Sequence, residues 1–226
     1  MTPLWGAAIV WRMRRVTVVP LVALGFIVLY VIVVRPRTVR WGATDEEVTR
    51  PLPGDRVVRG RAYTATRAIT IDAPPEEVWP WIVQIGSGRA GWYAIDRLDN
   101  GGVPSAQEVM PELQNLQVGD LIPRVPGQDV GPRVLEIDSG RRMLWATEDE
   151  LAWDWVLEPF GQGRTRLISR IRERYPPLLS TRMLYALVAS TGDIVMIWMQ
   201  LRGIKRRAER RASLSGSASP TRRTPR

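Results

Sequence analysis

Residues 61–100, RAYTATRAITIDAPPEEVWPWIVQIGSGRAGWYAIDRLDN, decide the fold, because a strand, a helix and a glycine loop follow one another there. The run 64–71 alternates two sets of residues rich in β-branched side chains, which is typical of a strand. Asp72 and two prolines then precede Glu76 and Glu77, an order that favours a helix start with Asp72 as its cap. We therefore predict a strand that runs directly into a helix.

The glycines at positions 86, 88 and 91 form a G-x-G-x-x-G pattern after this helix. A dinucleotide-binding fingerprint needs another context, with the glycines after a strand and at the opening of a helix. We interpret the pattern as a loop that requires positive φ angles or close backbone approach. No cofactor is predicted from it.

The run ITIDAPPEEVW at 69–79, followed by the glycine pattern and WY, resembles the opening of SRPBCC proteins. This START/Bet v 1-like superfamily includes polyketide cyclase-like members. The run LRGIKRR at 201–207 is similar to the end of the family's last helix. The resemblance implies an α+β helix-grip domain over residues 61–207, in which a curved antiparallel sheet wraps around a long C-terminal helix and encloses an apolar cavity. It does not choose an activity, since one scaffold carries many functions.

An uncharged apolar segment, VTVVPLVALGFIVLYVIVV at 16–34, precedes this domain. At about 1.5 Å per residue it spans roughly 28 Å, close to the thickness of a hydrocarbon core. It is longer than the roughly 7–15 residues of a signal-peptide core, and the RPR that follows is no cleavage site. We predict a transmembrane helix within residues 1–40, a linker over 41–60 and a basic disordered tail over 208–226.

The basic charge of the chain lies at its C-terminal end. Residues 202–226 hold nine Lys or Arg and one acid, so they carry +8 of the net charge of +9. Arginines flank both ends of the apolar segment equally, so the positive-inside rule does not orient it. A polybasic end would find anionic lipid at the cytoplasmic surface. We therefore expect a single-pass protein of the cell membrane with a cytoplasmic domain. The tail lacks interleaved aromatic residues, so no nucleic-acid partner is predicted.

The run 116–125 predicts a strand, a turn at Gly119 and Asp120, and a second strand. Alternating patterns predict further strands at 133–137, 142–147, 152–158 and 165–174. We expect one face of the sheet to point inward and the other to be wet. Asp154 and Glu158 would then lie on the wet surface, opposite the tryptophans of the same strand.

After two prolines, residues 178–212 predict a long helix whose apolar stripe includes Ile194, Val195, Trp198 and Leu201. A second membrane span over 183–201 is the alternative. Asp193 near its middle would cost roughly 2.5–3.5 kcal/mol in a bilayer. We therefore favour a helix that fills the concavity of the sheet.

Cysteine and histidine are absent, so thiolate chemistry and the commonest general base and metal ligand are excluded. No cluster has metal-ligand spacing, so no metal site is predicted, and no catalytic residue is identified. Among the carboxylates, Asp96 is the best candidate for a pocket acid because Trp92 and Tyr93 directly precede it.

The leading hypothesis is a binding module for a hydrophobic or amphipathic small molecule, such as a lipid or a polyketide-like compound. One alternative is an enzyme of the cyclase or dehydratase type that uses a cavity Asp, Glu or Tyr. Another is an interaction protein whose core is filled by its own tryptophans. The candidate cavity residues are Trp81, Trp92, Tyr93, Asp96, Trp145, Trp153, Trp155, Ser169 and Trp198.

Overall fold

The computed structural model describes residues 25, 27–175 and 190–217. The chain divides into two units, Met1–Thr38 and Val39–Arg226. In the first unit the described residues include η1 (Tyr30–Val34), a π-helical turn, and α2 (Arg35–Thr38). None of the helices in the described ranges combines the length and the hydropathy needed to cross a membrane. Residues 16–24 and 26 lie outside those ranges, so the anchor stays a prediction.

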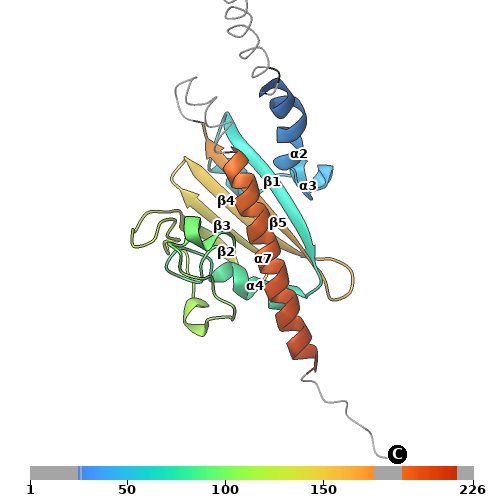
Figure 1. The fold of residues 1–226 in the computed structure, drawn as a ribbon, viewed down its shortest axis with the longest axis vertical. Coiled ribbons are helices and arrows are strands. Elements are labelled where there is room, and N and C mark those ends of the chain that lie inside the picture. The colour runs from blue at the N-terminus through green and yellow to red at the C-terminus, as the bar shows by residue number, and fades with distance from the viewer. Residues whose placement is uncertain (1–24, 26, 176–189, 218–226) are drawn as a thin grey trace, which may run out of the picture. The chain divides into compact units, whose positions relative to one another are not determined.

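One antiparallel sheet of five strands forms the second unit, in the order β1-β5-β4-β3-β2 (Figure 1). Each observed strand was predicted to within a few residues of its ends. The two strands expected within 116–125 do not form, and Leu121 makes only an isolated bridge with Arg133. The register pairs Ala68 of β1 with Ile168 of β5, so the first strand closes against the last. The bounds are β1 (Ala62–Ile71), β2 (Arg133–Asp138), β3 (Arg142–Thr147), β4 (Leu151–Pro159) and β5 (Thr165–Arg174).

The long C-terminal helix, α7 (Ser190–Ser217), lies across one face of this sheet (Figure 1). Its buried stripe consists of Ile197, Leu201, Ile204 and Ala208, which join the main core with residues of the sheet and of α4 (Pro75–Val83). This arrangement of sheet and helix agrees with the expected helix-grip architecture. Ile197 and Leu201, which belong to the alternative second span, therefore pack in the domain core, whereas 183–189 lie outside the described residues.

The buried face of α7 is not the face that the sequence predicted. Val195 and Trp198 were expected to be buried, but they are 48% and 37% exposed. Close packing at Gly203 explains the difference, because a Cβ atom there would lie 2.4 Å from the Tyr93 carbonyl oxygen. The backbone of α7 can approach the loop around Tyr93 only on the side that carries Gly203, and this orientation of the helix turns Trp198 outward.

The connection between β1 and β2 begins with α4 and the glycine loop and contains α5 (Asp96–Asp99) and η3 (Pro111–Leu113). The predicted cap is wrong, because α4 begins at Pro75 and Pro74 is its N-cap residue, without a side-chain hydrogen bond. The glycine loop is confirmed. All three of its glycines have positive φ, and a Cβ atom on Gly91 would lie 2.4 Å from the Ser105 hydroxyl oxygen.

Residues 41–60, expected to be a linker, instead cover the outer face of the sheet as α3 (Asp45–Thr49) and η2 (Pro53–Arg56). The Trp41 carbonyl oxygen accepts a hydrogen bond from Ala68 N at 3.1 Å, which extends the edge at β1. The expectation of a wet outer face is therefore wrong. Its alternating arginines resemble a solvated surface in sequence, yet Arg166 and Arg170 are bound by groups of the covering segment.

Asp154 lies under this cover and is 1% exposed, which corrects its expected surface position. Its Oδ1 accepts a hydrogen bond from Gly54 N at 3.3 Å. Burial is the main cause that raises its pKa, to about 6, and the neighbouring Asp55 adds to it. Glu158, four residues later, stays near the surface and pairs with Arg50 at 2.6 Å.

The raised pKa of Asp154 predicts a pH-dependent stability. Between pH 4 and pH 6 the folded state keeps a proton that the unfolded state has lost, so stability falls as pH rises through this window. In Asp154→Asn the hydrogen bond from Gly54 N is retained and the buried charge is removed. We expect the variant to match the parent at pH 4 and to exceed its free energy of unfolding by about 2–3 kcal/mol at pH 7. Chemical denaturation of both proteins at pH 4 and pH 7 measures the free energies of unfolding. If the difference between variant and parent is the same at the two pH values, the prediction is refuted.

Candidate functional site

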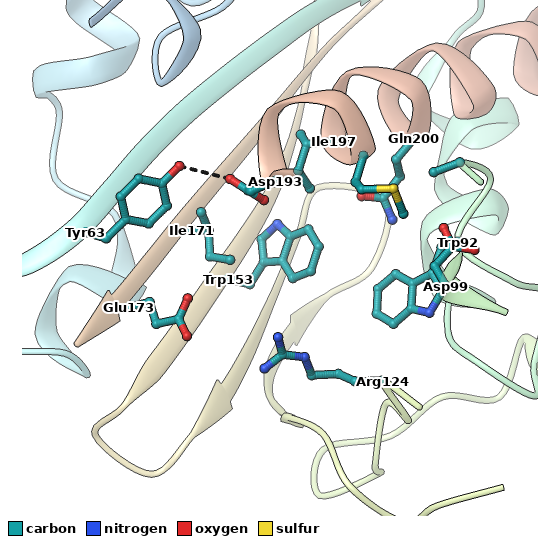
Figure 2. A pocket seen from close by; sticks show the side chains of 12 residues that line it. Tyr63, Trp92, Asp99, Arg124, Trp153, Ile171, Glu173, Asp193, Ile197 and Gln200 are labelled. Atoms are coloured by element: carbon teal, nitrogen blue, oxygen red, sulfur yellow. Dashed lines mark hydrogen bonds between the residues drawn. The ribbon is translucent and has the colours of Figure 1, made fainter. Parts of the chain in front are cut away.

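A cavity of about 340 Å³ lies between α7 and the inner face of the sheet (Figure 2). Strands β1, β4 and β5 supply one wall, α7 supplies the opposite wall, and the connection between α4 and β2 supplies the rest. Its lining consists of Tyr63, Trp92, Ala94, Asp99, Arg124, Trp153, Ile171, Glu173, Asp193, Met196, Ile197 and Gln200.

Two stacked indoles form the aromatic part of the lining. The rings of Trp92 and Trp153 are nearly parallel, 6° apart in plane, with centroids 6.1 Å apart. Trp153 Nε1 donates to the Ser169 hydroxyl at 2.7 Å, which holds its ring against the sheet. Offset-stacked aromatic rings are favourable beyond their buried area. The two rings therefore give the cavity a rigid apolar surface.

Two buried N–H groups in this lining have no acceptor among the described residues. Trp92 is 9% exposed and Gln200 is 2% exposed, and neither Trp92 Nε1 nor Gln200 Nε2 has a partner there. Buried donors are nearly always satisfied by protein or water, and an unmade bond costs about 1–3 kcal/mol. Two side chains of the lining therefore carry N–H groups that lack an acceptor among the described residues.

An ion pair joins the sheet to the beginning of α7 at one end of the cavity. Arg67 of β1, 2% exposed, donates to Asp193 Oδ2 at 2.9 Å. The Tyr63 hydroxyl donates to the same oxygen at 2.9 Å, as Figure 2 shows. Burial and the Asp193 charge raise the pKa of Tyr63, so it stays a donor at neutral pH. The Asp193 charge is thus neutralised by Arg67 and is not free for a ligand.

Asp99 is one of three carboxyl groups in the lining, with Glu173 and Asp193. Its Oδ2 accepts from Ile95 N at 3.2 Å, while Oδ1 is buried without a partner among the described residues. Burial raises the pKa of Asp99. The exposed Arg124 reaches the cavity from a neighbouring loop (Figure 2). In the described part of the chain, no three acidic side chains come together as a metal site.

The structure brings only some of the predicted cavity residues to the cavity. Trp92 and Trp153 line it, and Ser169 holds Trp153 in place. Trp81, Trp145 and Trp155 do not line it, because they are at most 2% exposed and pack within the core. These tryptophans do not fill the whole interior of the described domain, which counts against the filled-core alternative.

Tyr93, Asp96 and Trp198 also lie away from the cavity, which corrects three further expectations. Tyr93 packs under α7, with Arg207 Cζ 4.5 Å from its ring centroid and its hydroxyl accepting from Gln84 Nε2 at 2.9 Å. Asp96 accepts from the Ser105 backbone N at 3.0 Å and so fixes its own loop. The outward rotation of α7 places Trp198 on the surface.

Sequence reasoning missed the polar members of the lining, which are Tyr63, Asp99, Arg124, Glu173, Asp193 and Gln200. Asp193 and Gln200 did carry a signal, because each interrupts an otherwise apolar stretch of helix. Asp99 and Arg124 carried none, since polar residues are ordinary in loops.

No protein-family description and no curated protein sequence matches this chain. Several solved structures are similar at low identity. A conserved protein of unknown function from Enterococcus faecalis, EF2215, is 13% identical, with a TM-score of 0.40 over 74% of this chain and 80% of its own. The Polyketide_cyc-like protein Cgl2372 from Corynebacterium glutamicum is 16% identical, with a TM-score of 0.33 over 74% and 100%. CalU16 from Micromonospora echinospora is 19% identical, with a TM-score of 0.31 over 74% and 94%. At these values the likenesses add no argument to the geometry described above.

Proposed function

We propose that this chain is a membrane-anchored protein of the SRPBCC superfamily that binds an amphipathic small molecule in the cavity beside α7. The ligand has an apolar body and at least one hydrogen-bond acceptor, such as a carbonyl or hydroxyl oxygen. The observation that carries the proposal is a cavity, apolar over most of its surface, whose lining includes Trp92 and Gln200, two side chains with N–H groups that have no acceptor among the described residues.

The chemistry of the lining supports this ligand class. Trp153, Ile171 and Ile197 offer apolar surface, which favours removing a hydrophobic ligand from water. An acceptor placed against Trp92 or Gln200 would satisfy donors that are otherwise buried without a bond. The volume lies at the lower end of the range of about 300–1,000 Å³ for small-molecule pockets. A compact ring system or part of a lipid would suit that size.

The anchor and the location belong to the same proposal. The apolar run at 16–34 supports a single-pass anchor in the cell membrane, with the domain in the cytoplasm. We expect the full chain to stay with membranes after alkaline carbonate extraction. Protease should reach the domain only after spheroplasts are lysed. Release into the soluble fraction would contradict the anchor, and digestion in intact spheroplasts would contradict the orientation.

Gln200→Leu tests the ligand site. The variant keeps nearly the same volume but loses the unpaired donor, so ligand affinity should fall about 10-fold, while stability should be unchanged or slightly higher. Native mass spectrometry of the detergent-extracted full chain identifies the co-purified molecule and measures how much is retained. Gln117→Leu, the same change at an exposed position, should retain the parental amount. If Gln200→Leu and Gln117→Leu retain equal amounts of the co-purified molecule, or if no molecule co-purifies, the proposal is contradicted.

A second function, a cyclase or dehydratase, is favoured by one observation. Asp99 is an acid of the cavity lining whose pKa is raised by burial and whose Oδ1 has no partner among the described residues, and a raised pKa in a cleft is typical of a general acid or base. It replaces Asp96 as the candidate. Asp99→Asn should lower turnover of a β-hydroxy ketone about 100-fold or more without reducing ligand retention. No turnover by the parent chain would exclude this alternative and leave the binding function.

A further inference from the structure

A second hollow, which the function above does not use, lies on another side of α7. This basic groove has a volume of about 480 Å³ and is formed by the edge at β1, the segment around Trp41 and the face of α7 that bears Arg202. Residues of α7 in the first cavity are Asp193, Met196, Ile197 and Gln200. The residues of α7 that line the basic groove are Arg202, Lys205 and Arg206. The two hollows therefore use different residues of one helix.

The charges in the basic groove are only partly neutralised. Arg166 is held by Glu47, with an N–O distance of 2.6 Å. Lys205 is held by Glu209 at 3.0 Å, with Asp72 further away at 3.5 Å. Arg202 and Arg206 have no carboxylate partner among the described residues. Because they are four positions apart on one helix, the two residues lie on the same face of α7, where both can bind one anion.

Aromatic and aliphatic side chains continue this face of α7. Arg202 Cζ lies 4.2 Å from the centroid of the Trp198 ring, and Val195 is exposed one turn earlier. Trp41 lines the groove from the opposite side. Tryptophan next to arginine, with exposed aliphatic groups alongside, is typical of residues at a lipid–water interface.

We propose that the basic groove binds the phosphate headgroup of an anionic phospholipid, with Arg202 and Arg206 as the phosphate ligands. The choice of a lipid over soluble phosphate rests on the proposed anchor. The residues between Val34 and Trp41 can reach at most about 25 Å, so an anchor that ends at Val34 would keep the groove near headgroups. Charge complementarity with an anionic surface adds about 1 kcal/mol per arginine.

The test uses the full chain in neutral detergent micelles that contain either phosphatidylglycerol or phosphatidylcholine with the same acyl chains. Native mass spectrometry measures the lipid retained. We expect tight binding of phosphatidylglycerol only. In R202Q/R206Q its Kd should rise about 25-fold, or about fivefold for each arginine. The control R222Q/R223Q removes the same charge from the tail and should change the Kd less than about threefold.

Three results would overturn the proposal. Equal binding of the two lipids would show that charge does not select the ligand. An equal loss of phosphatidylglycerol affinity in R222Q/R223Q and R202Q/R206Q would show that total charge, and not the groove, binds the lipid. Displacement by inorganic phosphate at the concentration of the lipid would show a site for soluble phosphate. The assay needs neither the anchor nor the first cavity, so R202Q/R206Q should retain the co-purified molecule that Gln200→Leu loses.

Discussion

Arg170→Leu is expected to lower the free energy of unfolding by about 3–5 kcal/mol. Arg170 is 3% exposed and connects β5 to the segment that covers the outer face. It donates to the carbonyl oxygens of Glu47, Val48 and Arg50 at 2.6–3.0 Å, and to Asp55 Oδ2 at 2.8 Å. Without the guanidinium group, carbonyl groups at the end of α3 lose a donor, and the half-buried carboxylate of Asp55 keeps only the Leu52 N–H on its Oδ2.

Arg170→Lys should recover little of this loss, because one ammonium group cannot reproduce a planar fork with several fixed donors. Arg174→Leu is the matched control on the same strand. It breaks an exposed pair with Asp149 and should cost less than about 1 kcal/mol. Chemical denaturation of the detergent-solubilised full chain measures all three variants. An equal effect of Arg170→Leu and Arg174→Leu would show that the covering segment does not depend on this arginine.

Asp193→Ala is expected to cost about 3 kcal/mol and to disorder the ligand cavity at the same time. Arg67 would lose the carboxylate that neutralises its buried guanidinium group, and Tyr63 would lose its acceptor. The expected loss in the free energy of unfolding lies at the lower end of the range for broken buried ion pairs, because the Asp193 side chain is 23% exposed. The variant should therefore unfold at lower denaturant and retain less of the co-purified molecule.

The double variant Arg67→Met/Asp193→Leu separates the charge from the packing. Replacing both partners by apolar groups removes the unpaired charge, so stability should recover by about 2 kcal/mol or more relative to Asp193→Ala. A double variant as unstable as the single one would show that the pair acts through geometry rather than neutralisation. Asp193→Asn, which keeps an acceptor for Tyr63, should fall between the parent and Asp193→Ala.

The strands could be predicted because their period of two is local. In β4 the tryptophans at 153 and 155 point to the core side and Asp154 to the opposite side, as the alternation required. The burial of Asp154 could not be predicted from that alternation. Whether a polar face meets water or another segment depends on residues about a hundred positions away, here those around Gly54.

The cavity could be predicted only in outline. Trp92 and Trp153 belong to its lining, but a buried tryptophan in a core and one in a cavity look alike in sequence. The same limit applies to α7, where the stripe containing Trp198 and the stripe containing Ile197 both fit a helical period. Contact between Gly203 and Tyr93 decides between them, and that contact joins segments far apart in the chain.

By itself, the sequence of this protein determined the five strands of the sheet, the helix that follows the first strand and the glycine loop, because hydrophobic period, proline and glycine act over a few residues. The tertiary structure alone decided that residues 41–60 cover the sheet, that Asp193 meets Arg67, and that Asp99 rather than Asp96 enters the cavity. The physical reason is that burial and charge pairing are properties of groups brought together by folding, and local patterns do not contain them.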